Sequence, residues 1–274
     1  MSSDESTEPQ FDPRGKVVVV TGAASGIGKS LAELFAAEGA AAVIVTDRDE
    51  AGATAVAEGI GSVARGVGVD VANKTAIEAL VADIEANEGP IDVFISNAGY
   101  GVGGGLSLPD DEWKQMMEVH MWSHLYAARA VVPGMVERGG GYILNTASAA
   151  GLLTQMDSGP YAVSKHAAVA FGEWLLINYG DRGIGVSVLC PQAVRTNIMA
   201  NRVKTGNEPK GRQAAGDGVL EPEDVARDCL DAMREGRFLV LPHPEVLTYF
   251  QRKATDYDRW LSGMRRFRRR LGGK

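Results

Sequence analysis

Short apolar runs suited to β-strands alternate with segments that repeat apolar residues at helical spacing along most of the chain. This alternation predicts a parallel sheet with helices on both faces, and right-handed crossovers make such a sheet doubly wound. The expected fold class is therefore α/β, in a single domain. Strands are predicted over residues 17–20, 42–45, 67–69, 93–96, 142–146, 185–189 and 238–241, and helices over residues 27–38, 75–87, 111–132, 161–179 and 222–235.

The composition is that of a globular protein with one sizeable core. Of the 274 residues, 45% are hydrophobic and 23% are charged. The N-terminus lacks the basic and apolar regions of a secretory signal, and no apolar run approaches the ~18 residues of a membrane-spanning helix. Cys190 and Cys229 form no CxxC pair and have no histidine nearby in sequence, so we expect free thiols, no metal site and a cytoplasmic protein.

Charge divides the chain into an acidic body and a basic end. The net charge is −7, and residues 259–274 contribute +7 with no acidic residue, so the rest of the chain carries −14. Phosphate contacts need a basic face, so the acidic body argues against nucleic acid as the main partner.

The two ends of the chain differ from its middle. We expect residues 1–13 to be a disordered leader, residues 14–255 to form the domain with a mobile lid at about 197–220, and residues 256–274 to form a basic amphipathic helix or tail. Trp260, Met264, Phe267 and Leu271 recur at helical spacing in that tail. This stripe could dock onto its own fold or a neighbouring subunit, could contact a membrane surface or nucleic acid, or could belong to a frayed end.

A glycine-rich turn follows the first predicted strand. Gly22, Gly26 and Gly28 lead directly into a helix, and such a turn lets the backbone approach a pyrophosphate while the helix N-terminus supplies N–H groups. Asp47 ends the second predicted strand 19 residues after Gly28, where a carboxylate can accept hydrogen bonds from an adenosine ribose. The alternative is a tight strand-to-helix turn that binds nothing.

Further motifs follow the later strands in a fixed order. Asp70-Val71 follows the third, Asn97-Ala98-Gly99 the fourth and Ser148 the fifth, and the run from Tyr161 to Lys165 (Tyr-Ala-Val-Ser-Lys) comes next. Together with the glycine pattern, this set resembles the short-chain dehydrogenase/reductase family over about residues 14–242. The resemblance implies a Rossmann-type fold of about seven strands, a nicotinamide dinucleotide, and hydride transfer between an alcohol and a carbonyl.

The resemblance also implies a role for each motif residue. Ser148 would orient the substrate oxygen, Tyr161 would exchange its proton, and Lys165 would bind the nicotinamide ribose and favour the tyrosinate. Contacts to the cofactor are expected from Gly22, Ser25, Gly26, Ile27, Gly28, Asp47, Arg48, Asp70, Val71, Asn97, Ala98, Gly99, Tyr161, Lys165, Val194 and Thr196.

Elementary chemistry supports the pairing of Tyr161 with Lys165. A tyrosine with a pKa near ~10 is a poor base at neutral pH unless a positive neighbour favours its anion. Lys165 follows four residues later, which places it on the same face of a helix. Tyr and Lys at this spacing are also common on ordinary helix surfaces, and Ser148 alone could be a simple polar strand end.

Three positions depart from the family's pattern: His120 stands where the family has an Asn, Ser96 replaces the first Asn of Asn-Asn-Ala-Gly, and Gln192 replaces the Gly of Pro-Gly. His120 either takes over the proton path of the Asn or fills space in the helix. The change to Ser96 is expected to alter a loop hydrogen bond, whereas Gln192 would place a side chain near the nicotinamide.

The cofactor and the substrate can be narrowed further. Asp47 would repel a 2′-phosphate and so favours NAD over NADP, although Arg48 could pair with such a phosphate. Residues 100–108 and 152–159 offer apolar side chains and no Arg or Lys, which predicts a small apolar alcohol or ketone of steroid, terpenoid or acyl type. We expect a homodimer or homotetramer. The competing hypothesis is a catalytically silent dinucleotide-binding protein that acts through protein interactions.

Overall fold

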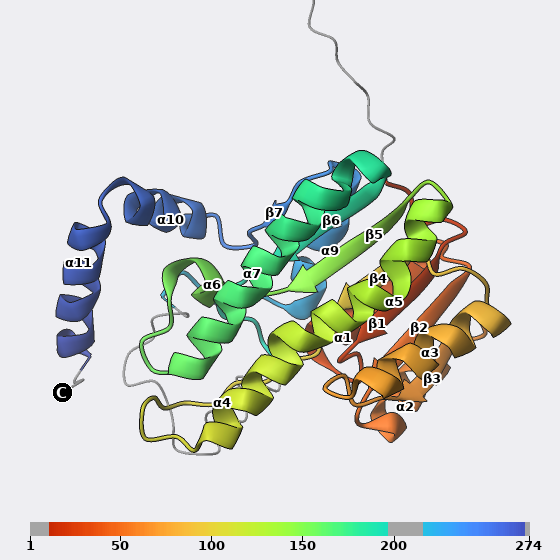
Figure 1. Cartoon of the computed structure of the whole chain (residues 1–274), viewed down its shortest axis with the longest axis horizontal. Helices are drawn as coiled ribbons and strands as arrows, with labels where there is room; N and C mark the ends of the chain where they lie inside the picture. Colours follow the sequence, from red (N-terminus) through yellow and green to blue (C-terminus); the bar gives the residue numbers. More distant parts are fainter. Residues whose placement is uncertain (1–10, 197–215, 272–274) are drawn as a thin grey trace, which may run out of the picture.

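The computed structural model describes residues 11–196 and 216–271. In this part of the chain, seven parallel strands form one sheet in the order β3-β2-β1-β4-β5-β6-β7, which confirms the predicted α/β doubly wound architecture (Figure 1). The strands are β1 (Val17–Thr21), β2 (Ala42–Asp47), β3 (Ala64–Gly68), β4 (Val93–Ser96), β5 (Gly141–Thr146), β6 (Ile184–Leu189) and β7 (Leu239–Val240).

The helices cover both faces of this sheet. They are α1 (Gly26–Ala37), α2 (Glu50–Ile60), α3 (Lys74–Asn87), α4 (Asp110–Met117), the π-helix η1 (Glu118–Trp122), α5 (Ser123–Glu137), α6 (Ala150–Leu153), α7 (Gly159–Tyr179), the 3-10 helix η2 (Gly180–Arg182), α9 (Pro222–Arg234), α10 (Glu245–Thr255) and α11 (Tyr257–Arg270). Among these residues, no helix is long and apolar enough to cross a bilayer.

Alternation along the strands divides the core into two layers. Val18 and Val20 of β1 pack with α1, α2 and α9, whereas Val17 and Val19 pack with α3, α5 and α7 on the other face. A parallel strand buried on both faces needs apolar residues at every position, and the burial of all of β1 shows this. Figure 1 shows α5 and α7 in front of the sheet.

Several elements differ from the sequence-based prediction. Helices α2 and α10 were not predicted, and β3 begins three residues earlier than expected. The predicted helix 111–132 consists of α4, η1 and α5, and it continues past Pro133 to Glu137. Proline in a helix lacks one N–H donor, which weakens the helix but does not end it here.

The N-terminal packing begins before the predicted domain start. Phe11 contacts the rings of Phe35 and Tyr142, with centroids 6.2 and 5.1 Å apart, and Pro13 is buried. Residues 11–13, assigned above to a disordered leader, are therefore packed against the body. Residues 1–10 and most of the expected lid, 197–215, lie outside the described residues, while Leu220 pairs with Val194.

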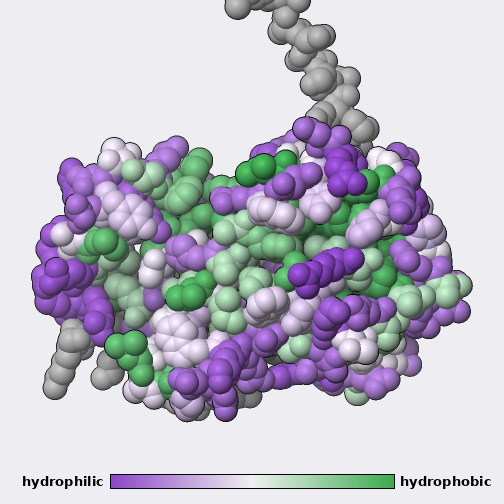
Figure 2. All heavy atoms as spheres, viewed as in Figure 1, coloured by the Kyte–Doolittle hydropathy of each residue, from purple (hydrophilic) through white to green (hydrophobic). Residues whose placement is uncertain are grey.

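The C-terminal helices α10 and α11 lie beyond one end of the sheet (Figure 1). Trp260 packs against a hydrophobic cluster that α6, α7 and α10 share, whereas Phe267 is 36% exposed. Figure 2 shows mostly hydrophilic side chains over α11 and more hydrophobic ones over the centre of the face formed by α5 and α7. The predicted tail helix is present, and the first residue of its stripe is docked on the chain's own body.

Candidate active site

The strand order reverses between β1 and β4, and ligands of doubly wound sheets bind at the carboxyl ends of strands beside such a reversal. Gly22 lies at the end of β1 with a φ of +66°, and a Cβ there would come within 2.6 Å of the Ala98 Cα. A Cβ on Gly28 would come within 2.5 Å of the Asn97 Nδ2. These positions therefore require glycine, and together they leave a backbone cradle at the first turn of α1.

The cradle fits a pyrophosphate. Ser25 is the N-cap of α1 and has an extended backbone, and Gly26 and Ile27 begin the helix. A helix N-terminus carries a partial positive charge and backbone N–H groups that have no acceptor within the helix. Both features favour binding of the negatively charged pyrophosphate. Thr196 lies against the same turn, since a Cβ on Gly26 would meet its Cγ2 at 3.0 Å.

Asp47 is held against the glycine-rich turn. Its Oδ2 accepts a hydrogen bond from the Ala24 N–H at 3.1 Å, and its Oδ1 accepts one from the Asp49 N–H at 3.1 Å. Each carboxylate oxygen can accept more than one hydrogen bond, so the group can still receive ribose hydroxyls. Arg48 is exposed beside it.

The next strand places Asp70 and Val71 along the same edge of the sheet. The Oδ1 of Asp70 accepts a hydrogen bond from the Ala72 N–H at 3.0 Å, and the Val71 side chain is buried. The loop after β3 is thereby fixed by its own acidic side chain, with Asp70 itself exposed.

Asn97 ties the ends of three strands together. Its backbone N–H donates to the Thr21 Oγ1 at 2.9 Å, and its Nδ2 donates to the Thr21 carbonyl at 3.0 Å. Its Oδ1 accepts from the Thr146 hydroxyl at 3.2 Å. The Ala98 N–H also donates to the Thr21 Oγ1, at 3.1 Å, so the loop that continues to Gly99 is fixed at its first two residues.

Helix α7 carries the pair of residues expected to do the chemistry. Ser158 caps its N-terminus and accepts from the Tyr161 N–H at 3.4 Å. Lys165 lies one helical turn after Tyr161, and its side chain is 3% exposed. Its Nζ donates a hydrogen bond to the Thr146 carbonyl at 2.8 Å. Its Nζ lies 5.8 Å from the centre of the Tyr161 ring. Burial lowers the pKa of Lys165 from 10.5 to about 7.

Ser148 lies just after the carboxyl end of β5. Its Oγ accepts a hydrogen bond from the Ala150 N–H at 3.1 Å and donates to the Pro191 carbonyl at 3.4 Å. The hydroxyl is thereby positioned between the segments that leave β5 and β6. Val194, further along the second of these segments, is 6% exposed.

Two residues that depart from the family pattern take unexpected positions. His120 is fully buried in η1, with its ring edge-on to the Tyr161 ring at 5.5 Å. The Gln192 side chain donates from Nε2 to the Asp217 Oδ2 at 2.7 Å, and the Oδ1 of Asp217 accepts from the Tyr249 hydroxyl at 3.0 Å. Gln192 is thus held by Asp217, which lies in the last part of the expected lid, and through Asp217 it is linked to Tyr249 of α10.

Only some of the apolar side chains in residues 100–108 and 152–159, the segments expected to contact the substrate, are exposed. Val102 and Met156 are partly exposed, and Leu106 is fully exposed. Leu152 and Leu153, named with the same segments, are instead buried in the cluster with α10 and belong to the core. Sequence could not separate these two groups, because an apolar residue on a short helix can face either way.

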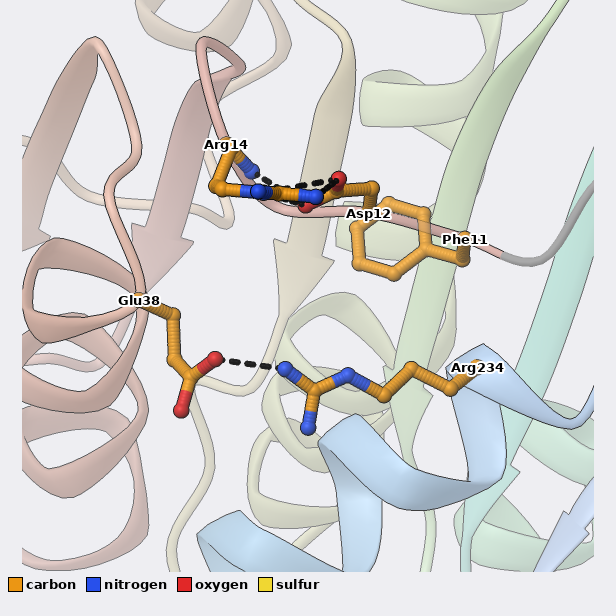
Figure 3. Close-up of a pocket in the computed structure, with 5 residues that line it drawn as sticks. All are labelled: Phe11, Asp12, Arg14, Glu38 and Arg234. Carbon is orange, nitrogen blue, oxygen red and sulfur yellow. Dashed lines mark hydrogen bonds and ion pairs between the residues drawn. The ribbon is translucent and has the colours of Figure 1, made fainter.

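A different hollow lies at the opposite edge of the sheet. It has a volume of about 430 Å³ and is lined by Phe11, Asp12, Arg14, Glu38 and Arg234 (Figure 3). Arg14 pairs with Asp12 at 2.6 Å and Arg234 with Glu38 at 2.5 Å. Both cations are neutralised by carboxylates, so this hollow is not an anion site. It lies near the amino end of β1, away from Tyr161.

The polar partners of the site were not predicted from sequence. Thr21, Thr146 and Ser164 hold the motif residues by hydrogen bonds, yet each is a common polar residue at a strand end or on a helix. The sequence feature that could have indicated the two threonines is their position as the last residues of β1 and β5, at the carboxyl edge of the sheet.

Comparisons with known proteins agree with this geometry. Residues 16–207 match the family model described as short chain dehydrogenase. The chain is 34% identical over 253 residues to 1-deoxy-11-beta-hydroxypentalenate dehydrogenase of Streptomyces exfoliatus, covering 90% of each protein. It is 36% identical over 188 residues to 3beta-hydroxysteroid dehydrogenase of Mediterraneibacter gnavus, covering 67% of each.

A solved structure shares this fold over most of the chain. The short chain dehydrogenase/reductase from Burkholderia phymatum, in complex with NAD, superposes with a TM-score of 0.83 at 31% identity, covering 90% of this chain and 96% of that one. The chain therefore belongs to the short-chain dehydrogenase/reductase family, whose members act on CH–OH groups with NAD or NADP.

Proposed function

We propose that this protein is an NAD(H)-dependent oxidoreductase that interconverts a secondary alcohol and a ketone on an apolar substrate, with Tyr161 as the general acid and base. The observation that carries the proposal is the buried Lys165, one helical turn from Tyr161, with its Nζ 5.8 Å from the ring centre. A buried ammonium group is costly, and one that lies beside a titratable side chain at the carboxyl edge of the sheet marks a candidate functional site.

The proposed chemistry follows from these positions. Tyr161 takes the hydroxyl proton of the alcohol as the carbonyl forms, and in the reverse direction it returns the proton to the oxygen. Lys165 lowers the free energy of the tyrosinate through its positive charge, and Ser148 holds the substrate oxygen by a hydrogen bond. The nicotinamide, when bound, accepts or supplies the hydride.

We propose NAD rather than NADP as the cofactor. Asp47 is fixed by two backbone hydrogen bonds at the end of β2, so its carboxylate would lie beside a 2′-phosphate and repel it. Arg48 is exposed next to it and is the group that could reverse this preference. The cofactor contacts proposed for the glycine-rich turn, Asp70, Val71, Asn97, Ala98, Gly99, Val194 and Thr196 all lie along the carboxyl edge of the sheet or on the segments leaving it.

The substrate class rests on the apolar segments near this edge. Val102, Leu106 and Met156 offer partly or fully exposed apolar side chains there. The names of the relatives, a hydroxysteroid dehydrogenase and a hydroxypentalenate dehydrogenase, support a secondary alcohol on a largely apolar skeleton.

We also propose that the protein is a homodimer or homotetramer. The apolar side chains of Val163, Trp174 and Ile177 on α7 are 52%, 50% and 80% exposed, which is unusual for residues of this size on one helix. Packing against a second copy would bury them.

A screen of secondary alcohols and ketones tests the proposal. Steroid, terpenoid and acyl compounds would be offered with NAD(H) and with NADP(H), and turnover followed by the absorbance of the reduced cofactor. We expect turnover of at least one apolar compound, with NAD preferred. Tight binding of NAD in calorimetry without turnover of any class would instead support the silent dinucleotide-binding protein.

A further inference from the structure

His120 lies in η1, the π-helical turn between α4 and α5, and its side chain is fully buried. One side of its ring faces the loop that follows β4, and the other faces the first turns of α7. π-Turns in long helices often occur at functional sites, because the extra residue re-aims a side chain. Here the turn brings one imidazole between the two segments that carry the loop 97–100 and the pair Tyr161 and Lys165.

The hydrogen bonds of His120 determine which nitrogen carries the proton. Its Nε2 lies 3.2 Å from the backbone nitrogen of Tyr100, and a backbone N–H can only donate. Nε2 must therefore be the acceptor, so the proton of the neutral ring lies on Nδ1. Nδ1 lies 2.9 Å from the Ser164 Oγ, and the Ser164 hydroxyl in turn donates to the Tyr161 carbonyl at 3.1 Å.

These bonds form one directed chain. The Tyr100 N–H donates to His120, the His120 Nδ1–H donates to Ser164, and Ser164 donates to Tyr161. Both ring nitrogens have a hydrogen-bond partner: the Tyr100 N–H fixes Nε2 as an acceptor, and the neutral ring then donates from Nδ1 to Ser164. A proton relay needs a ring that can lose a proton at one nitrogen and gain one at the other, which would break the bond to Tyr100.

The surroundings also keep the ring neutral. Burial and, after it, the neighbouring charge of Lys165 lower the pKa of His120 well below its usual value of 6.5. Tyr100 and Tyr161, whose rings lie 5.7 and 5.5 Å away, are the other titratable groups facing it. A second proton on Nε2 would point at the Tyr100 N–H, so a donor would face a donor.

Gly99 shows how closely these groups fit. A Cβ at Gly99 would lie 3.2 Å from the His120 Nε2 and 3.6 Å from the Lys165 Nζ. The loop, the imidazole and the lysine therefore pack as one unit, and a displacement of the ring would be transmitted to the other two.

We infer that His120 is a positioning residue: as a neutral imidazole protonated on Nδ1, it bridges the loop 97–100 to the turn 161–165, and it neither takes up nor gives away a proton during the reaction. This inference rests on the proposed function, since it concerns the alignment of Tyr161 and Lys165. It differs both from a proton path through His120 and from simple filling of space.

A double-mutant cycle separates the bridge from space filling. Ser164→Ala removes the acceptor of Nδ1–H and leaves the imidazole in place, whereas His120→Leu removes the ring. We expect each change to lower kcat roughly ten- to a hundredfold, because small misplacements of reacting groups have effects of this size. The double variant should be no slower than His120→Leu alone, since both changes break the same chain.

His124 provides a matched control. It is a second buried imidazole one turn away, and neither of its ring nitrogens has a hydrogen-bond partner in the described part of the chain. His124→Leu should leave kcat unchanged. If Ser164→Ala also leaves kcat unchanged, or if the losses of the two single variants multiply, the bridge is overturned, while the role of Tyr161 is judged separately by Tyr161→Phe.

The tautomer can be observed directly. Long-range ¹H–¹⁵N correlation spectra of the full chain, with His120 assigned by its absence in His120→Leu, report which nitrogen carries the proton. We expect Nδ1–H and no titration over the pH range of activity. An Nε2–H ring, or a ring that titrates together with kcat, would contradict the inference and support a proton path.

Discussion

Lys165→Met should stabilise the cofactor-free protein at low pH while abolishing activity. Lys165 is 3% exposed, and burial lowers its pKa from 10.5 to about 7, so its charged form is less stable in the folded protein than in the unfolded chain. Methionine is similar in length and needs no hydration. The substitution also removes the donor to the Thr146 carbonyl, which costs the same at every pH.

The pH dependence follows from the direction of the shift. A base with a lowered pKa destabilises the fold fully below its folded value, and the cost disappears as pH rises through the unfolded value of 10.5. With a folded pKa of about 7, the cost is about 5 kcal/mol near pH 6 and about 2 kcal/mol near pH 9. The advantage of the Met variant should therefore shrink by about 3 kcal/mol between these conditions.

Urea unfolding of both proteins at the two pH values measures this difference. Lys114→Met is the matched control, because the Lys114 side chain is 72% exposed and its removal should change the free energy of unfolding equally at both. If the difference in the free energy of unfolding between Lys165→Met and the parent stays constant with pH, burial does not destabilise the charged form of Lys165, and the reasoning is refuted.

Three other changes test separate parts of the structure. Asp47→Ala should weaken NAD and shift the ratio of kcat/KM toward NADP by roughly ten- to a hundredfold, and a parent enzyme that already prefers NADP would contradict the assignment. Gly28→Ala should abolish NAD binding in calorimetry because its Cβ would meet Asn97 at 2.5 Å, whereas Gly59→Ala, in open space on α2, should leave binding intact. Deleting residues 256–274 should lower the melting temperature because the partly buried Trp260 leaves its cluster, a contribution on the order of 1 kcal/mol, and an unchanged melting temperature would show that the tail adds no stability.

The sheet could be predicted because its strands are buried on both faces. A short continuous run of β-branched residues such as that of β1 is typical of a strand buried on both faces of a parallel sheet. Helix α2 was missed because its inward face consists of Ala53, Val56 and Ala57, a weak apolar signal in a segment rich in Ala and Gly. Helix α10 was missed because its inward face combines Val246, Tyr249 and Phe250 with a lysine, Lys253, which interrupts the apolar pattern.

Lys253 shows why such packing is invisible in sequence. It is 6% exposed, and its Nζ donates to the Leu152 carbonyl at 2.6 Å and approaches the His166 Nε2 at 3.5 Å. These partners lie on α6 and α7, about a hundred residues earlier. No local pattern indicates that a lysine near the C-terminus will be buried against them.

The candidate site was predictable for a different reason. The family resemblance supplied most of its motif residues, and because these lie at strand ends and at one helical spacing, the topology brings them to one edge of the sheet. The hydrogen bonds that hold them, such as those of Thr21 to Asn97, join residues 76 positions apart and depend on the finished fold. The tautomer of His120 also depends on the finished fold, because it follows from the hydrogen bonds with Tyr100 and Ser164.

The kinetics of Tyr161→Phe test the central claim most directly. The change removes one hydroxyl and keeps the ring, so NAD affinity in calorimetry should stay near that of the parent while kcat falls on the order of a thousandfold or more. A variant that binds NAD normally and retains kcat within about tenfold of the parent would show that Tyr161 does not exchange the substrate proton.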